Sequence, residues 1–175
     1  MSPQSDVAEI PVAKLRRLYD YWFSKRQLPD LPACADIVFD EITDLLPHIV
    51  LAEVLKKGRH FRFMLIGSDL LVGVDPTGKL QHEELPAGIY RDHITALYRR
   101  GAAGPGALYS RSSYGYREVE GPRTIGRLFL PLASDGKTVD MMLIGQVSDS
   151  KVAMGHSPWQ TNPPSITEEI EFRLP

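Results

Sequence analysis

The sequence has a single cysteine, Cys34, among its 175 residues, and no apolar run long enough for a membrane helix. One cysteine cannot form an internal disulfide bond, so nothing indicates an oxidising compartment. A membrane helix needs about 18 consecutive apolar residues, and proline, histidine or acidic residues interrupt the most apolar stretches here. The first residues lack the basic and apolar segments of a secretory signal. We therefore expect a cytoplasmic protein that does not contact the membrane.

The sequence also has no excess of positive charge and no recognisable catalytic motif. Its net charge is −2, which provides no general attraction to nucleic acids. The nucleophile motif Gly-x-Ser-x-Gly and the Cys-x-x-Cys and His-Glu-x-x-His metal motifs are absent. The composition, 43% hydrophobic and 24% charged, is ordinary for a globular domain. We expect a binding protein that is not an enzyme and has no nucleic-acid partner.

The clearest helical pattern lies between Pro11 and Pro29. Pro11 fits the first turn of a helix, which should end before Pro29. The apolar residues of this segment share one helical face, and they are Leu15, Leu18, Tyr19, Trp22 and Phe23. Two interpretations of this wide stripe stay open. It caps the domain's own sheet, or it meets its copy across a two-fold axis in a homodimer.

Short apolar segments separated by turn residues are typical of strands, and the rest of the chain carries five of them. They cover residues 49–54, 61–66, 108–118, 124–132 and 139–147. Helical patterns follow Asp40 and Ser68 and run from Tyr90 to Tyr98, and Asp135-Gly136 predicts a hairpin. Because neighbouring strands can pair as hairpins, we predict an α+β fold with helices on one face of a five-stranded antiparallel sheet.

The two ends of the chain set the expected domain limits. We expect a flexible N-terminus over residues 1–10, a helical segment over 11–47, a core over 48–147, and an extended or disordered tail over 148–175. The tail has no clear periodicity and carries four prolines. A short apolar tether around Ile166, Ile170 and Phe172 stays open.

An ordered succession of short motifs resembles a known family. The motifs are LYDYW (18–22), ITDLLPH (42–48), FRFMLIG (61–67), DPTG (75–78), LFLPL (128–132), DG (135–136) and VDMML (139–143). With the order of two strands, a helical middle and three strands, they resemble the PAS fold, and in particular the α-proteobacterial single-domain proteins of the PAS_5 family. The resemblance spans Lys14 to Val147. It implies binding of small molecules or partner proteins, or dimerisation, with no cofactor shared across this branch.

A ligand pocket in such a domain is expected between the inner sheet face and the middle helices. The candidate lining residues are Phe63, Leu65, Tyr90, His93, Ile94, Tyr114, Arg127, Phe129 and Met141. Arg127 is the most informative, because a buried guanidinium needs an anionic or hydrogen-bonding partner. If its side chain points inward, it indicates a carboxylate or phosphate ligand. If it points outward, it is an ordinary polar residue on the sheet face. Apolar residues flank it on both strand faces, so its direction stays open.

Two residues are candidates for the haem or flavin that some PAS domains hold. His93 lies on the second long helix beside its apolar face, where a haem-binding PAS domain places a histidine. The alternative is an ordinary histidine at the edge of the helix. Cys34 precedes the strands, whereas the reactive cysteine of flavin photosensors follows the early strands, so we expect an idle or buried thiol. The cofactor stays unknown.

The expected function is a small-molecule or signal-sensing PAS module that acts by associating with a protein partner. No segment after Val147 resembles an effector domain. The alternative is a ligand-free dimeric scaffold or interaction protein. The sensor predicts a closed cavity, whereas the scaffold predicts a filled interior and an exposed apolar patch.

Overall fold

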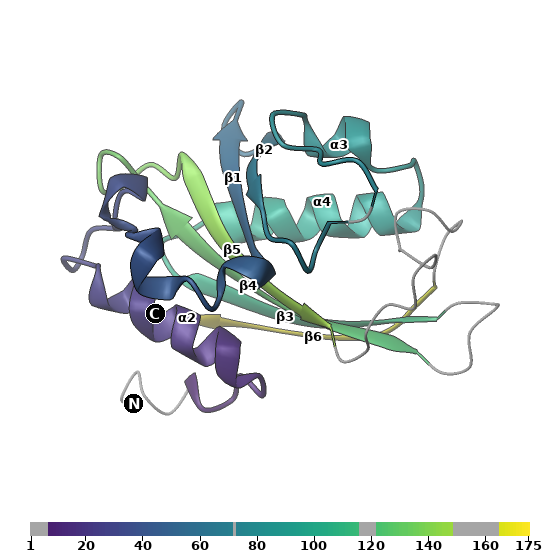
Figure 1. Ribbon diagram of the computed structural model, residues 1–175, viewed down its shortest axis with the longest axis horizontal. Helices are drawn as coiled ribbons and strands as arrows, with labels where there is room; N and C mark the ends of the chain where they lie inside the picture. The colour runs from purple at the N-terminus through teal and green to yellow at the C-terminus, as the bar shows by residue number, and fades with distance from the viewer. Residues whose placement is uncertain (1–6, 72, 116–121, 149–164) are drawn as a thin grey trace.

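An antiparallel sheet lies at the centre of the chain (Figure 1). The computed structural model describes all residues except 1–6, 72, 116–121 and 149–164. In the described part, six strands lie in the order β2-β1-β5-β4-β3-β6. They are β1 (Ile49–Leu55), β2 (His60–Ile66), β3 (Ala107–Gly115), β4 (Arg123–Leu132), β5 (Met141–Ser148) and β6 (Ser165–Leu174). The α+β fold and its antiparallel sheet are confirmed, with six strands where five were expected.

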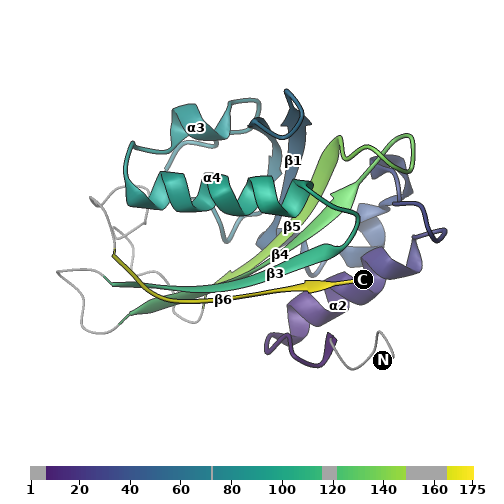
Figure 2. The same ribbon diagram turned by 180° about the vertical axis from the view of Figure 1, so that it is seen from behind.

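Helices cover both faces of the sheet. The α-helices are α2 (Ala13–Ser24), α3 (Gln81–Glu84) and α4 (Ile89–Ala102). Figures 1 and 2 place α4 on one face and α2 on the other. The helices between the strands lie on one face as predicted, and the additional N-terminal helix, α2, buries the second face with its apolar stripe. The helix expected after Asp40 is a pair of 3-10 turns, Phe39–Ile42 and Leu46–His48, and turns also replace the one expected after Ser68.

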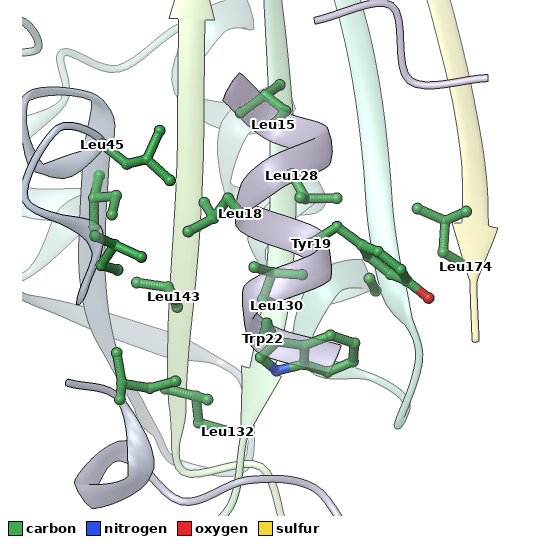
Figure 3. Packing of buried hydrophobic residues seen from close by; sticks show 14 of the residues in the cluster. Leu15, Leu18, Tyr19, Trp22, Leu45, Leu128, Leu130, Leu132, Leu143 and Leu174 are labelled. Atoms are coloured by element: carbon green, nitrogen blue, oxygen red, sulfur yellow. The ribbon is translucent and has the colours of Figure 1, made fainter. Parts of the chain in front are cut away.

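The alternation of β4 divides the core into two layers. Leu128, Leu130 and Leu132 point to the α2 layer (Figure 3), whereas Ile125 and Phe129 point to the α4 layer. Every one of these side chains is at most 5% exposed. Arg127 stands between the last two on the same face, so it points toward α4.

The C-terminal segment forms an edge strand. β6 pairs with β3 from Ala107 opposite Leu174 to Gly115 opposite Ser165. Residues 165–174 form a strand where an extended or disordered tail was expected. Phe172 and Leu174 pack in the α2 layer, Ile166 packs in the α4 layer, and Ile170 is exposed. Residues 149–164 lie outside the described residues. The N-terminal prediction also fails at Ile10, which is buried in the core, while residues 1–6 are not described.

The segment after β2 returns along the outer edge of that strand. The Phe63 amide donates to the carbonyl of Lys79 at 3.0 Å, and the Gly78 amide donates to the carbonyl of Phe63 at 2.7 Å. Arg62 and Leu80 also form a bridge. This return closes the edge of β2 and holds α3 beside β2 and α4, where both clefts described below are found.

Candidate functional site

A pocket of about 100 Å³ lies in the α4 layer, between the sheet and the segment that follows β2. Most of its wall is apolar, and its polar groups are few, which is typical of a small-molecule site. The lining residues are Val50, Phe63, Ile66, Leu70, Leu71, Val74, Pro76, Gln81, Glu84, Tyr90, Ile94, Tyr98 and Gln146. The sheet, α3 and α4 therefore all contribute to one concave surface.

Arg127 forms the polar floor behind this pocket. Its side chain is fully buried, with 1% of its surface exposed. Nε donates to Gln146 Oε1 at 2.9 Å, Nη1 donates to the Tyr114 hydroxyl at 2.9 Å, and Nη2 donates to the Tyr90 hydroxyl at 3.1 Å. Tyr90 and Gln146 also line the pocket, so Arg127 is one hydrogen bond away from a ligand there.

The charge of Arg127 has no anionic partner within the described part of the chain. All three of its hydrogen-bond acceptors are neutral, and none of the ion pairs of the described residues includes it. Arginine keeps its proton at physiological pH, and an unpaired charge in a protein interior is costly. Three neutral acceptors satisfy its N–H groups only in part, since a guanidinium has five N–H donors.

Two side-chain amides add further donors to the pocket wall. Gln81 is 1% exposed, and its Nε2 has no hydrogen-bond partner in the described structure. Arg127 holds Oε1 of Gln146, and the half-buried Gln146 amide also lines the pocket. A buried unsatisfied donor needs an explanation, and a ligand that accepts hydrogen bonds would supply one. The acidic residue on this wall, Glu84, lies 3.3 Å from the Lys79 ammonium.

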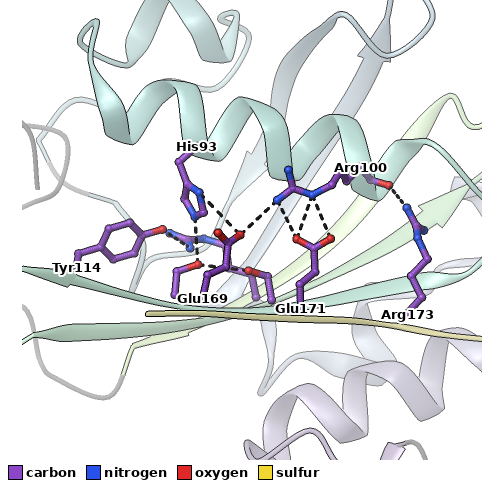
Figure 4. Close-up of polar contacts among 9 residues, drawn as sticks. His93, Arg100, Tyr114, Glu169, Glu171 and Arg173 are labelled. Carbon is purple, nitrogen blue, oxygen red and sulfur yellow. Dashed lines mark hydrogen bonds and ion pairs between the residues drawn. The ribbon is translucent and has the colours of Figure 1, made fainter. Parts of the chain in front are cut away.

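His93 is buried beside this network but points to the strands and not into the pocket (Figure 4). Its Nε2 lies 3.1 Å from the Ser112 hydroxyl, and its Nδ1 lies 3.9 Å from a Glu169 carboxylate oxygen. Burial is the main cause that lowers the pKa of His93 to about 4, and the charges of Arg127 and Arg100 add to it. His93 is therefore neutral at pH 7. It is not among the pocket-lining residues, where a haem ligand would have to lie.

The structure brings only part of the predicted ligand set together. Phe63, Tyr90 and Ile94 line the pocket, and Tyr114, Arg127 and Phe129 lie in the same core layer behind it. Leu65 and Met141 pack on the opposite face, with the α2 layer. Gln81, Gln146 and Tyr98 also line the pocket, but they were not predicted from the sequence. Tyr98 lies eight residues after Tyr90 on the helical stripe, which was a usable signal, whereas neither glutamine stood out in its segment.

The predicted dimer stripe lies within the chain's own core. Leu15, Leu18, Tyr19 and Trp22 are each at most 2% exposed and pack on the sheet (Figure 3). The Trp22 indole donates to the carbonyl of Pro131 at 2.9 Å. Phe23 is half-buried and stacks on Tyr19 with the ring centroids 5.7 Å apart. These contacts fit the interpretation that α2 caps its own sheet, and a homodimer stays a prediction.

Neither a cluster of metal ligands nor an activated thiol is found among the described residues. They contain no group of three or more His, Cys, Asp or Glu side chains that could hold a metal ion. Burial raises the pKa of the half-buried Cys34 thiol, and the Asp140 charge adds to this shift, which disfavours the reactive thiolate. No helix of the described chain is long and apolar enough to cross a membrane.

Comparisons of the chain with protein-family models, with curated proteins and with solved structures give no match. The α+β fold with its six-stranded antiparallel sheet therefore rests on the structure itself.

Proposed function

We propose that this chain is a PAS-like sensor module that binds a small, partly apolar molecule carrying a carboxylate or a similar acceptor group. The observation that carries the proposal is the fully buried Arg127, whose partners are neutral and in part line the pocket. A bound carboxylate would place negative charge near this guanidinium. The signal would pass to a protein partner by association.

The order of the elements supports the PAS-like part of the proposal. Two hairpin strands, a helical middle and a three-stranded meander follow one another in β1 to β5, as the motif resemblance implies. The ligand-free scaffold is the competing hypothesis, and it expects a filled interior. A pocket with an unsatisfied buried amide at Gln81 favours a ligand.

Thermal unfolding with matched probe pairs tests the carboxylate specificity. Butyrate and benzoate are compared with butyramide and benzamide, which have the same shapes without the charge. A ligand at a hundredfold excess over its Kd stabilises the folded state by about 2.7 kcal/mol, which raises the Tm of a chain of this size by about 5–10 °C. We expect a larger rise for at least one carboxylate than for its amide.

Two arginine variants make this test specific. Arg127→Met should abolish the preference for the carboxylate probe, because the buried charge is removed. Arg62→Met removes an arginine from the partly exposed surface of β2 and should leave the preference unchanged. Equal Tm changes for every carboxylate and its amide, or a preference that survives in Arg127→Met, would contradict the proposal. Native mass spectrometry of the purified chain would identify a ligand that is retained through purification.

A further inference from the structure

A second cleft, of about 340 Å³, opens on the outer side of α4. Three separate elements meet there: the start of β2 with the turn before it, α3, and the outer stripe of α4. Figure 2 shows α3 above α4, and α3 also contacts β2. The lining residues are Arg59, His60, His82, Arg91, Asp92, Thr95 and Arg99. None of them lines the pocket near Arg127, so the two sites are distinct.

The charge of this cleft is opposite in sign to that of the chain. Three of the seven lining residues are arginines and one is an aspartate, whereas the whole chain has a net charge of −2. Arg91, Thr95 and Arg99 recur every four residues, so they form one stripe along α4. Arg99 reaches the neighbouring turn, where Nη2 lies 3.4 Å from the carbonyl oxygen of Arg59.

A pair of imidazoles lies in the same cleft. The Nδ1 atoms of His60 and His82 are 3.3 Å apart, and the ring centroids are 4.6 Å apart. At this distance one Nδ1 carries a proton that the other accepts. Burial, followed by the charges of Lys56, His82 and Arg99, lowers the pKa of His60, and Glu83 opposes this shift. Positive charge therefore exceeds negative charge here, since Asp92, 3.9 Å from Arg91 Nε, is the one carboxylate among the seven lining residues.

A metal ion is the other ligand that two close histidines suggest. The described residues contain no third His, Cys, Asp or Glu side chain in a position to complete a metal site with them. The neighbouring guanidinium groups would also repel a divalent cation. An oxyanion, in contrast, is attracted by every arginine of the cleft and accepts hydrogen bonds in the bidentate geometry that guanidinium favours.

We propose that this cleft binds a phosphate group of a small molecule. The guanidinium groups of Arg59, Arg91 and Arg99 supply charge and N–H donors, and the Thr95 hydroxyl and the one Nε2–H left in the imidazole pair are further donors. A phosphate bound there touches β2, α3 and α4 together, and so links the helical segment to the edge of the sheet. This inference does not rest on the proposed function of the Arg127 pocket.

Isothermal titration calorimetry at low ionic strength, with inorganic phosphate and pyrophosphate as probes, tests the proposal. Each charge-assisted hydrogen bond contributes about 1.5–3 kcal/mol, so losing one weakens binding by about tenfold or more. We expect Arg91→Gln and Arg99→Gln each to weaken pyrophosphate binding at least to this extent. Both side chains have exposed surface, so their loss should leave the Tm close to that of the unchanged chain.

Arg111→Gln is the matched control, because it removes the same charge from β3 on the α2 face. It should change the affinity by less than twofold, as should Arg127→Met, which alters only the first pocket. The proposal is overturned if neither probe binds, or if Arg111→Gln weakens binding as much as Arg91→Gln does. It is also overturned if Zn²⁺ binds through His60 and His82 while pyrophosphate does not bind.

Discussion

Replacing Tyr114 by phenylalanine should destabilise the chain by about 2 kcal/mol, although it removes a single oxygen atom. The Tyr114 hydroxyl is fully buried and accepts a hydrogen bond from Arg127 Nη1 at 2.9 Å. Hydrogen bonds to a charged group contribute about 1.5–3 kcal/mol each. The ring keeps its edge contacts with Tyr90 and His93, so packing is retained and the loss reports the hydrogen bond.

Tyr109→Phe is a control on the same strand. Tyr109 is as deeply buried as Tyr114, but it faces α2, and its hydroxyl has no partner in the described structure. Removing an unsatisfied buried hydroxyl should leave the stability unchanged or raise it slightly. Urea unfolding followed by circular dichroism gives the free energies of both variants. The Tm of Tyr114→Phe should fall by about 4–8 °C.

A double-mutant cycle with Arg127→Met identifies the interaction partner. Once the guanidinium is gone, the Tyr114 hydroxyl is an unpaired buried group, and its removal should cost nothing or stabilise the chain. The expected coupling energy is about 2 kcal/mol, within the range for groups in contact. If Tyr114→Phe and Tyr109→Phe have the same effect, or if the coupling is near zero, the guanidinium is not held by Tyr114, and the argument for an unpaired charge behind the pocket fails.

Three further predictions follow from other parts of the chain. The folded-state pKa of His93, about 4, lies below the unfolded value of about 6.5, so its contribution to stability is complete above pH 6.5 and is lost as the pH falls to 4. Between pH 7 and pH 4 the unfolding free energy of the unchanged chain should therefore fall by up to about 3 kcal/mol more than that of His93→Gln. Urea unfolding at several pH values measures this difference. Gly67→Ala should unfold the chain or lower its Tm strongly, because a Cβ there overlaps the backbone of the turn before β1, whereas Gly104→Ala, which meets no atom closer than 3.5 Å, should be nearly neutral in thermal melts. Arg100→Gln breaks the hydrogen bonds of 2.8–3.0 Å to Glu171 at a cost below about 1 kcal/mol, since the pair is partly exposed, yet it should speed hydrogen exchange in β6 more than in β1.

The elements that were predicted correctly are those with a strong local pattern. The five expected strands match β1 to β5 within a few residues, apart from positions 116–118 of the third, which lie outside the described residues, and the helical stripes match α2 and α4. β6 was not predicted, because the residues that pair with it lie far away in the sequence. Glu169 and Glu171 make it look like a solvated segment, but Arg100, about 70 residues earlier, binds both of them (Figure 4). Such a pairing cannot be inferred from residues 165–174 alone.

The candidate site was predictable to a smaller extent. Tyr90 and Ile94 were found because pocket residues of α4 lie on its buried stripe. The direction of Arg127 could not be inferred, since apolar residues flank it on both faces of β4, and only the positions of α2 and α4 show which layer it enters. Gln81 gave no signal because a four-residue helix has too few turns to show periodicity.

The energetic cost of burying the Arg127 charge is easier to explain by ligand recognition than by a contribution to the stability of the fold. A buried charge network can often be replaced by apolar side chains without loss of stability, and the replacement is sometimes stabilising. Arg127 instead stands opposite Gln146 in the register of β4 and β5, and its other acceptors come from α4 and β3. Three elements thus hold one guanidinium in a fixed position without neutralising it. An arrangement of this kind lowers stability in the empty state, and under the proposed function an anion bound beside Tyr90 and Gln146 would recover the loss.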